Sequence, residues 1–220
     1  MRRVDHPLDG HVDVFHADLD AQVPLGHLLS PEERSWATRL RRPHHRARYV
    51  AGRGLLRSLL AERLDIDPRR VPLGTGAHGK PCLTDDSDPA FSIAHSGGDL
   101  LITLTSAGEI GVDLEQPRCI DPLRLAVSCF SSIERDELLR LEPSTQLDAF
   151  FDGWVRKEAI SKADGRGLSL DFQSFSVTLR KPARVIAAPG GDSPSRWVLT
   201  ELHLRPGLPA AFALRGSDIP

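Results

Sequence analysis

Two short stretches carry acidic and basic side chains at spacings that could hold a metal ion and phosphate groups. In GVDLE, residues 111–115, Asp113 and Glu115 lie two positions apart. On a strand their carboxylates would share one face, roughly 7 Å apart, and like charges at that distance repel unless a cation lies nearby. An ordinary solvated strand face is the alternative that these five residues leave open.

The second stretch is WVRKEAISK, residues 154–162, within a helical pattern. A helix turns by roughly 100° per residue, which would place five side chains within an arc of roughly 140°. Glu158 and Lys162 form an i,i+4 pair that would stabilise any exposed helix and needs no function. However, two of the chain's four lysines on one face beside an indole favour a lined cleft. The residues of this face are Trp154, Lys157, Glu158, Ser161 and Lys162.

Taken together, Asp113, Glu115 and Glu158 form a set of oxygen ligands suited to Mg²⁺, for which Mn²⁺ could substitute. Such an ion completes its octahedron with phosphate oxygens and waters. Lys162 follows Glu158 by one helical turn and could contact the same phosphates as a point charge. These four residues predict a metal-assisted reaction at a phosphate.

The first half of the chain offers two further stretches that could bind phosphate. GTGAHGKP, residues 74–81, matches the P-loop pattern G-x-x-x-x-G-K-[ST] except at its last position. Pro81 supplies neither the hydroxyl that would hold Mg²⁺ nor an amide hydrogen for phosphate. The stretch is a damaged nucleotide site, a chance match, or a lysine that binds phosphate in another architecture. In AHSGG, residues 94–98, His95 and Ser96 precede two glycines that allow a tight turn against a ligand.

Two helices are expected near the start of the chain. In SPEERSWATRLRR, Ser30 is placed as N-cap, Pro31 at the first helical position, and Glu33 completes a capping box. This helix should run to about residue 42. Residues 44–64 place leucines at helical spacing and predict a second helix with one buried face. Four arginines are expected on its remaining surface: Arg46, Arg48, Arg53 and Arg57.

Strands follow helices in each half of the chain. The repeated order indicates an α+β protein of two packed lobes, residues 1–108 and 109–220, with a cleft between them. No sequence identity between the halves is evident, so the duplication is inferred from topology alone. Strands are expected at 91–97, 100–115, 175–180, 196–205 and 210–215, and further helices at 121–130, 131–141 and 144–163.

Composition excludes several classes of partner. The 28 basic and 30 acidic residues give a formal charge of -2, so no global field favours nucleic acid or an anionic membrane. The N-terminus lacks the apolar run of a signal peptide, and no stretch approaches the ~18 apolar residues of a membrane span. Three cysteines without metal-ligand spacing suit a reducing compartment. We expect a cytoplasmic protein that binds neither nucleic acid nor membrane.

The two chemical stretches together resemble a known pair of signatures. GVDLE and FxxWVRKEAISK are similar to the patterns G-[IV]-D-[ILV]-E and [FW]-x-x-x-[WK]-x-x-K-E-[AS]-x-x-K of 4′-phosphopantetheinyl transferases. The resemblance covers nearly the whole chain. It extends through SPEER, RxxxGRxLLR, GKP, FSIAHSG and GLSLDFQSFSV in the order and approximate spacing of the surfactin-synthetase-activating type. Either signature alone is short enough to arise by chance, whereas the pair is specific.

The resemblance implies a pseudo-symmetric α+β fold of two similar lobes with coenzyme A in the cleft between them. It implies that 4′-phosphopantetheine passes from coenzyme A to a serine of an apo acyl or peptidyl carrier protein, releasing adenosine 3′,5′-bisphosphate. A chain that supplies both lobes is expected to be a monomer and to serve nonribosomal peptide and polyketide synthases. Acidic carriers would dock near residues 120–140, with Arg118, Arg124, Phe130 and Arg135 as candidate contacts.

Positions carried over from the resemblance assign roles to individual residues. Asp113, Glu115 and Glu158 would hold Mg²⁺ against the pyrophosphate. Glu158 would also be the catalytic base, and Lys162 a catalytic contact to the phosphates. The remaining coenzyme A contacts would be Lys80, presented by a turn rather than a P-loop, His95, Ser96, Lys157, and Arg48 near the 3′-phosphate.

The chain departs from the resemblance where other members bind the 3′-phosphate. Glu33 and Trp36 stand where lysines are often found, and Ala94 stands where a serine often precedes the histidine. We therefore expect a weak preference for coenzyme A over its 3′-dephospho form. Two other functions stay open. One is a catalytically silent carrier-binding module, against which the intact acids and Lys162 count; the other is a Mg²⁺-dependent pyrophosphohydrolase of nucleotides.

Overall fold

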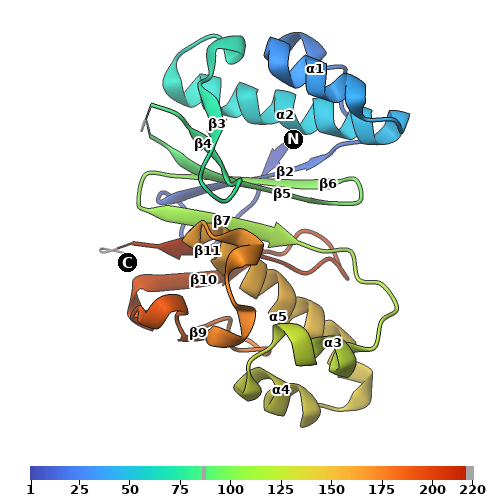
Figure 1. Ribbon diagram of the computed structural model, residues 1–220, viewed down its shortest axis with the longest axis vertical. Coiled ribbons are helices and arrows are strands. Elements are labelled where there is room, and N and C mark those ends of the chain that lie inside the picture. The colour runs from blue at the N-terminus through green and yellow to red at the C-terminus, as the bar shows by residue number, and fades with distance from the viewer. Residues whose placement is uncertain (86–87, 217–220) are drawn as a thin grey trace.

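The computed structural model describes residues 1–85 and 88–216, which form four layers (Figure 1). Helix α2, Pro43–Leu64, packs on the outer face of one antiparallel sheet, and helix α5, Pro143–Asp164, packs on the outer face of a second. The inner faces of the two sheets share an apolar core. The chain is thus an α+β protein. Among the described residues, no helix has the length and apolar composition needed to cross a membrane.

The N-terminal sheet has the strand order β1-β2-β6-β5. Its side chains alternate between two cores: Leu101 faces the inner core, whereas Leu100 and Ile102 face α2. A separate hairpin of β3 and β4 lies between α2 and β5 in the chain. The strands are β1 Arg2–Arg3, β2 Val12–Asp18, β3 Leu73–Thr75, β4 Pro81–Leu83, β5 Ala90–Ser96 and β6 Asp99–Thr105.

The first helix, α1 at Pro31–Arg39, begins as expected. Ser30 and Glu33 form the predicted capping box with each other's backbone amides. The helix ends before residue 42 because the residue that precedes Pro43 is disfavoured in helical conformation, and that proline opens α2 instead.

Arg57 corrects one expectation about α2. It was expected on the surface, but its side chain is 3% exposed. Its Nε donates to Glu33 Oε2 at 2.6 Å, and its Nη1 donates to the carbonyl oxygen of Pro68 at 2.8 Å. Burial is tolerated because a carboxylate and a backbone carbonyl accept from the guanidinium.

The C-terminal sheet has the strand order β10-β11-β7. The chain between β7 and β10 contains α3, α4, α5 and a minor hairpin of β8 and β9. The strand expected at 175–180 is regular only at Ser176–Val177. The remaining bounds are β7 Glu109–Leu114, β9 Val185–Ala187, β10 Trp197–Glu201, β11 Ala210–Arg215, α3 Pro122–Cys129 and α4 Ser132–Leu139. The 3₁₀ turns are Gly26–Leu28, Pro68–Arg70, Gly167–Ser169, Phe172–Ser174, Pro189–Gly191 and Pro194–Arg196.

The two sheets have equivalent strand orders. In the first half the order is β2-β6-β5, and in the second half it is β7-β11-β10. In both, the strand that comes last in the chain lies in the middle. The sheets meet where β5 and β7 lie close together, and the Val112 amide donates to Ser92 Oγ at 3.1 Å across this contact. Residues of both halves therefore meet along one seam.

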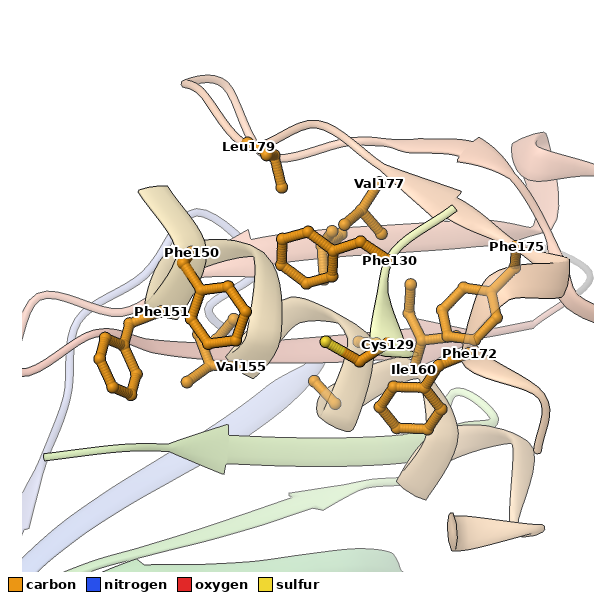
Figure 2. Close-up of a cluster of buried hydrophobic side chains, with 14 of the residues drawn as sticks. Cys129, Phe130, Phe150, Phe151, Val155, Ile160, Phe172, Phe175, Val177 and Leu179 are labelled. Atoms are coloured by element: carbon orange, nitrogen blue, oxygen red, sulfur yellow. The ribbon is translucent and has the colours of Figure 1, made fainter. Parts of the chain in front are cut away.

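Aromatic side chains fill the core beneath α5 (Figure 2). Phe130 is fully buried and stacks on Phe150 with ring centroids 5.1 Å apart. The expectation that Phe130 lies on a docking surface is therefore wrong. Helix α3 ends at Cys129, and the next residue turns into the core because its ring can pack there.

Candidate active site

Strand β7 and helix α5 approach each other closely at Gly111. A Cβ atom on this residue would lie 2.0 Å from the Ala159 carbonyl oxygen and 2.3 Å from the Ala163 amide nitrogen. Only glycine leaves room for the helix backbone at this distance. The approach brings the two chemical stretches together, since Asp113 lies two residues along the strand and Lys162 lies next to the contacted amide.

Replacing Gly111 with alanine is expected to lower the free energy of unfolding by about 2–3 kcal/mol, because the backbone of α5 must shift to admit a methyl group. Urea denaturation would measure the change. Gly52→Ala is a matched control, since a Cβ there meets only ordinary contacts at 3.7 Å and 3.8 Å. If the two variants had equal stability, the close approach would not be needed to hold the strand and the helix together.

Asp113 and Lys162 form an ion pair across this contact. The Nζ atom of Lys162 lies 2.7 Å from Asp113 Oδ1 and also donates to the Val112 carbonyl oxygen at 3.0 Å. Burial raises the pKa of the Asp113 carboxyl to about 6, although the Lys162 ammonium acts in the opposite direction. Two of the predicted site residues are therefore in direct contact.

Glu158 lies one turn before Lys162, and the charges of Asp113 and Lys162 both act on the pKa of its carboxyl. Burial, followed by the charge of Asp113, raises the pKa of the Glu158 carboxyl to about 7. The Glu115 carboxylate adds to this increase, whereas Lys162 opposes it. A carboxylate with a pKa near neutrality is well matched to accepting a proton at neutral pH.

Ser96 holds the third acid in place. Its Oγ donates to Glu115 Oε2 at 3.0 Å and accepts from the Gln116 amide at 3.0 Å. The Gln116 side chain in turn donates to Asp99 Oδ2 at 3.3 Å. The Ser96 hydroxyl thus orients the acidic stretch, and its expected contact to coenzyme A stays a prediction.

The three acids suit a hard divalent cation in their chemistry. Asp113, Glu115 and Glu158 are close enough for the charges of the first and second to raise the pKa of the third. Across residues 1–85 and 88–216, however, no three His, Cys, Asp or Glu side chains already converge as a metal cluster. Lys162 and Ser96 hold two of the acids instead. A cation would relieve the repulsion, and oxygen ligands of this type suit Mg²⁺.

Lys157 corrects one expectation about α5, that its ammonium contacts coenzyme A. Its side chain is fully buried, with Nζ 2.8 Å and 2.7 Å from the two carboxylate oxygens of Glu134 and 2.7 Å from the Phe175 carbonyl oxygen. The ammonium faces α4 and the residue before β8 and is closed off from solvent. Ser161 is also buried and donates to the Gly167 carbonyl oxygen.

Lys80 lies in a hairpin turn, as expected. Strand β4 begins at Pro81, and the Gly76 amide donates to the Lys80 carbonyl oxygen at 2.8 Å. No phosphate-cradling helix follows, so the stretch is not a P-loop. The Lys80 ammonium lies 2.9 Å from Glu109 Oε2 and lines a cavity of about 200 Å³. Lys162 lines the same cavity.

A second cavity, of about 420 Å³, lies beside α2 and is lined by Trp36, His45, Arg48, Tyr49, Arg53 and His95. Desolvation, followed by the charges of Lys162 and Arg48, lowers the pKa of His95. Glu33 does not line this cavity, because it is buried against Arg53 and Arg57. We refer to this space as the Arg48 cavity.

Comparison with known proteins settles the family. The model of the 4′-phosphopantetheinyl transferase superfamily matches residues 109–213. The chain is 33% identical over 193 residues to the 4′-phosphopantetheinyl transferase Sfp of Bacillus subtilis, covering 87% of this chain and 84% of that protein. The chain belongs to the 4′-phosphopantetheinyl transferases. It is also 35% identical over 197 residues to the 4′-phosphopantetheinyl transferase HetI of Nostoc sp., covering 87% of this chain and 81% of that protein.

Three acidic partners in this transferase escaped the sequence analysis. Asp20 pairs with Arg48, Glu109 with Lys80, and Glu134 with Lys157. For Glu134 a signal existed, because SSIE has the S-x-x-E pattern of a capping box, which the structure contains. Asp20 and Glu109 follow no local pattern, since their partners come from distant parts of the chain.

Proposed function

We propose that this transferase moves 4′-phosphopantetheine from coenzyme A to a serine of an apo acyl or peptidyl carrier protein and releases adenosine 3′,5′-bisphosphate. The observation that carries the proposal is the meeting of Asp113, Glu158 and Lys162 beside a cavity that Lys80 also lines. Mutually repelling acids next to two ammonium groups suit a pyrophosphate held by Mg²⁺. Membership of the family supports the same reaction.

The two halves are proposed to act as pseudo-symmetric lobes, residues 1–108 and 109–220, with coenzyme A in a cleft along their seam. The equivalent strand orders and the matching positions of α2 and α5 support this assignment. The acids come from the second lobe, whereas Arg48, Lys80 and His95 come from the first. Because one chain supplies both lobes, we propose a monomer.

Coenzyme A would lie with its two charged groups, the pyrophosphate and the 3′-phosphate, in the two cavities. Lys80 and Lys162 would bind the pyrophosphate in the smaller cavity. Arg48 and His95 would bind the 3′-phosphate end in the Arg48 cavity. A guanidinium group can bind a phosphate monoester through two parallel hydrogen bonds, whereas a lysine ammonium binds phosphate as a point charge.

The chemistry assigns roles to the site residues, and Glu158 has two of them. When bound by Asp113, Glu115 and Glu158, Mg²⁺ would neutralise pyrophosphate charge. Glu158 would take the proton from the hydroxyl of the carrier serine as the serine oxygen forms a bond to the pantetheine-bearing phosphorus. The bond between the two phosphates breaks, and Lys162 stabilises the charge that develops on the leaving bisphosphate.

Carrier proteins are proposed to dock on α3 and the groove beside it. Leu125 and Val127 of this helix are 40% and 61% exposed, and Arg124 is exposed next to them. A groove of about 510 Å³ leads from this surface towards the acidic site, lined among others by Glu115, Arg118, Leu125, Trp154 and Phe172. Exposed apolar and basic groups together suit an acidic carrier, including those of nonribosomal peptide and polyketide synthases.

Reversing the charge of Arg124 to glutamate is expected to raise the KM for an acidic carrier roughly 10-fold while kcat changes little, because a rim charge acts mainly on encounter. Steady-state transfer assays at several salt concentrations would measure it. Arg63→Glu is the control, since Arg63 is exposed on α2 away from this groove. An unchanged KM in the Arg124 variant would exclude this docking surface.

Mass spectrometry of apo carriers incubated with the enzyme, coenzyme A and Mg²⁺ tests the proposed function. The expected result is the gain of one phosphopantetheinyl group on the carrier serine. Release of phosphopantetheine without any carrier would instead identify a pyrophosphohydrolase. Carrier binding without modification, across carriers of several synthase classes, would identify a silent binding module.

A further inference from the structure

The guanidinium group of Arg48 is already occupied by a carboxylate of the same chain. Its Nε and Nη2 atoms donate to Asp20 Oδ1 and Oδ2 at 2.8 Å and 2.6 Å. This two-point geometry is the one that a phosphate monoester uses with arginine. The carboxylate therefore stands where an entering phosphate would be expected to bind.

Asp20 is held in this position by its surroundings. Its backbone amide donates to Asp18 Oδ1 at 2.9 Å, and its carboxylate lies against Gly98 in the turn that follows His95. The carboxylate is 54% exposed, so it can move into solvent without leaving a buried charge. Arg48 is 31% exposed and faces the Arg48 cavity.

The other residues around the Arg48 cavity add little positive charge to offset the Asp20 carboxylate. Trp36 is 51% exposed and contributes an indole, and Glu33 points away into its ion pairs. The pKa of His45 is lowered, mainly by desolvation and next by His44, which disfavours its charged form. Arg53 also lines the cavity, but its Nε already donates to Glu33 Oε1 at 3.0 Å. The Arg48 guanidinium, which faces the cavity, is shared with Asp20.

We propose that Asp20 is a specificity-determining residue that competes with the 3′-phosphate of coenzyme A for Arg48. This inference rests on the proposed function. It identifies Asp20 as a residue that weakens the contact between Arg48 and the 3′-phosphate. It accounts for the weak preference expected between coenzyme A and its 3′-dephospho form. Neutralising Asp20 would then tighten binding only for ligands that carry the 3′-phosphate.

The test is isothermal titration calorimetry of wild-type enzyme and Asp20→Asn with adenosine 3′,5′-bisphosphate and adenosine 5′-monophosphate. The variant is expected to bind the bisphosphate roughly threefold to fivefold more tightly, the range of a surface ion pair, with unchanged affinity for the monophosphate. Asp67→Asn is a matched control, because Asp67 makes the same two-point pair with Arg69 on the surface. The gain should disappear in Asp20→Asn combined with Arg48→Ala.

Three results would overturn the inference: equal gains for both nucleotides, a gain that survives loss of Arg48, or weaker bisphosphate binding in Asp20→Asn. The last would mean that Asp20 orients Arg48 for the phosphate instead of competing with it. These results are separable from failure of the proposed function. That failure would appear as absence of carrier modification by the wild-type enzyme, whatever the nucleotide affinities.

Discussion

Replacing Lys157 with methionine is expected to lower the free energy of unfolding by about 3–5 kcal/mol, although this lysine belongs to a catalytic signature. The substitution keeps the length of the side chain but removes the charge that faces Glu134, and both residues are 0% exposed. The Glu134 carboxylate also accepts from the amides of Ser131 and Val177 at 2.7 Å and 2.8 Å. These amides cannot replace a cation, so a buried charge would be left uncompensated.

Urea denaturation followed by far-ultraviolet circular dichroism would measure the loss. Lys181→Met is the matched control, because Lys181 pairs with Glu201 at 3.1 Å but is 66% exposed, and its loss should be within about 1 kcal/mol. Adding Glu134→Gln to the Lys157 variant should recover part of the stability, since the amide carries no charge. A loss below about 1 kcal/mol for Lys157→Met would mean that water or another cation reaches this position.

Replacing Glu158 with glutamine is expected to lower the rate of carrier modification by roughly 10³-fold, within the usual range for a general base. Glutamine keeps the shape of the side chain but cannot accept the serine proton, and it is a poorer metal ligand than a carboxylate. Single-turnover transfer to an apo carrier at saturating coenzyme A would measure the rate. Glu62→Gln, an exposed glutamate of α2, is the control. Activity within 10-fold of wild type would remove Glu158 from the catalytic role.

The same variant is expected to be more stable than the wild-type protein when no metal is added. The pKa of Glu158 rises from 4.5 to about 7 in the folded chain, so between these values the folded state binds more protons than the unfolded state. Stability from this group is present below pH 4.5 and is lost as the pH rises through 7. At pH 8 the glutamine variant should gain about 1–3 kcal/mol, with little difference at pH 4.5. Thermal unfolding in a chelating agent would show this gain, and a loss of stability at pH 8 would mean that the Glu158 charge does not destabilise the folded chain.

Local patterns predicted the parts of the site that depend on neighbours in the chain. The capping box of Ser30 and Glu33, the position of Asp113 on β7, and the spacing of Glu158 and Lys162 follow from short-range geometry, and the structure has each of them. Glu115 directly follows the last residue of β7. The turn that presents Lys80 was predicted from the family resemblance, and the structure confirms the turn. Pro81 by itself showed only that the stretch lacks an amide that a P-loop needs.

Long-range pairing decided what the sequence could not. Helical spacing places Lys157 and Glu158 on one arc, but it does not tell which part of that arc α4 and β8 will cover. Arg57 of α2 is buried for the same reason, because Glu33 of another helix neutralises it. Phe130 was misplaced because its exposure depends on the direction that the chain takes after α3 ends.

The neighbouring positions 157 and 158 are therefore under different selective pressures, one for folding and the other for chemistry. A descendant that had lost its chemistry but still had to fold would be held to Lys157 together with Glu134, whereas replacing Glu158 would relieve a cost. The lysine of the signature would then persist in silent members of the family and would not distinguish them from working enzymes. The acid beside it is the position that carries this information when a new sequence is assigned an activity.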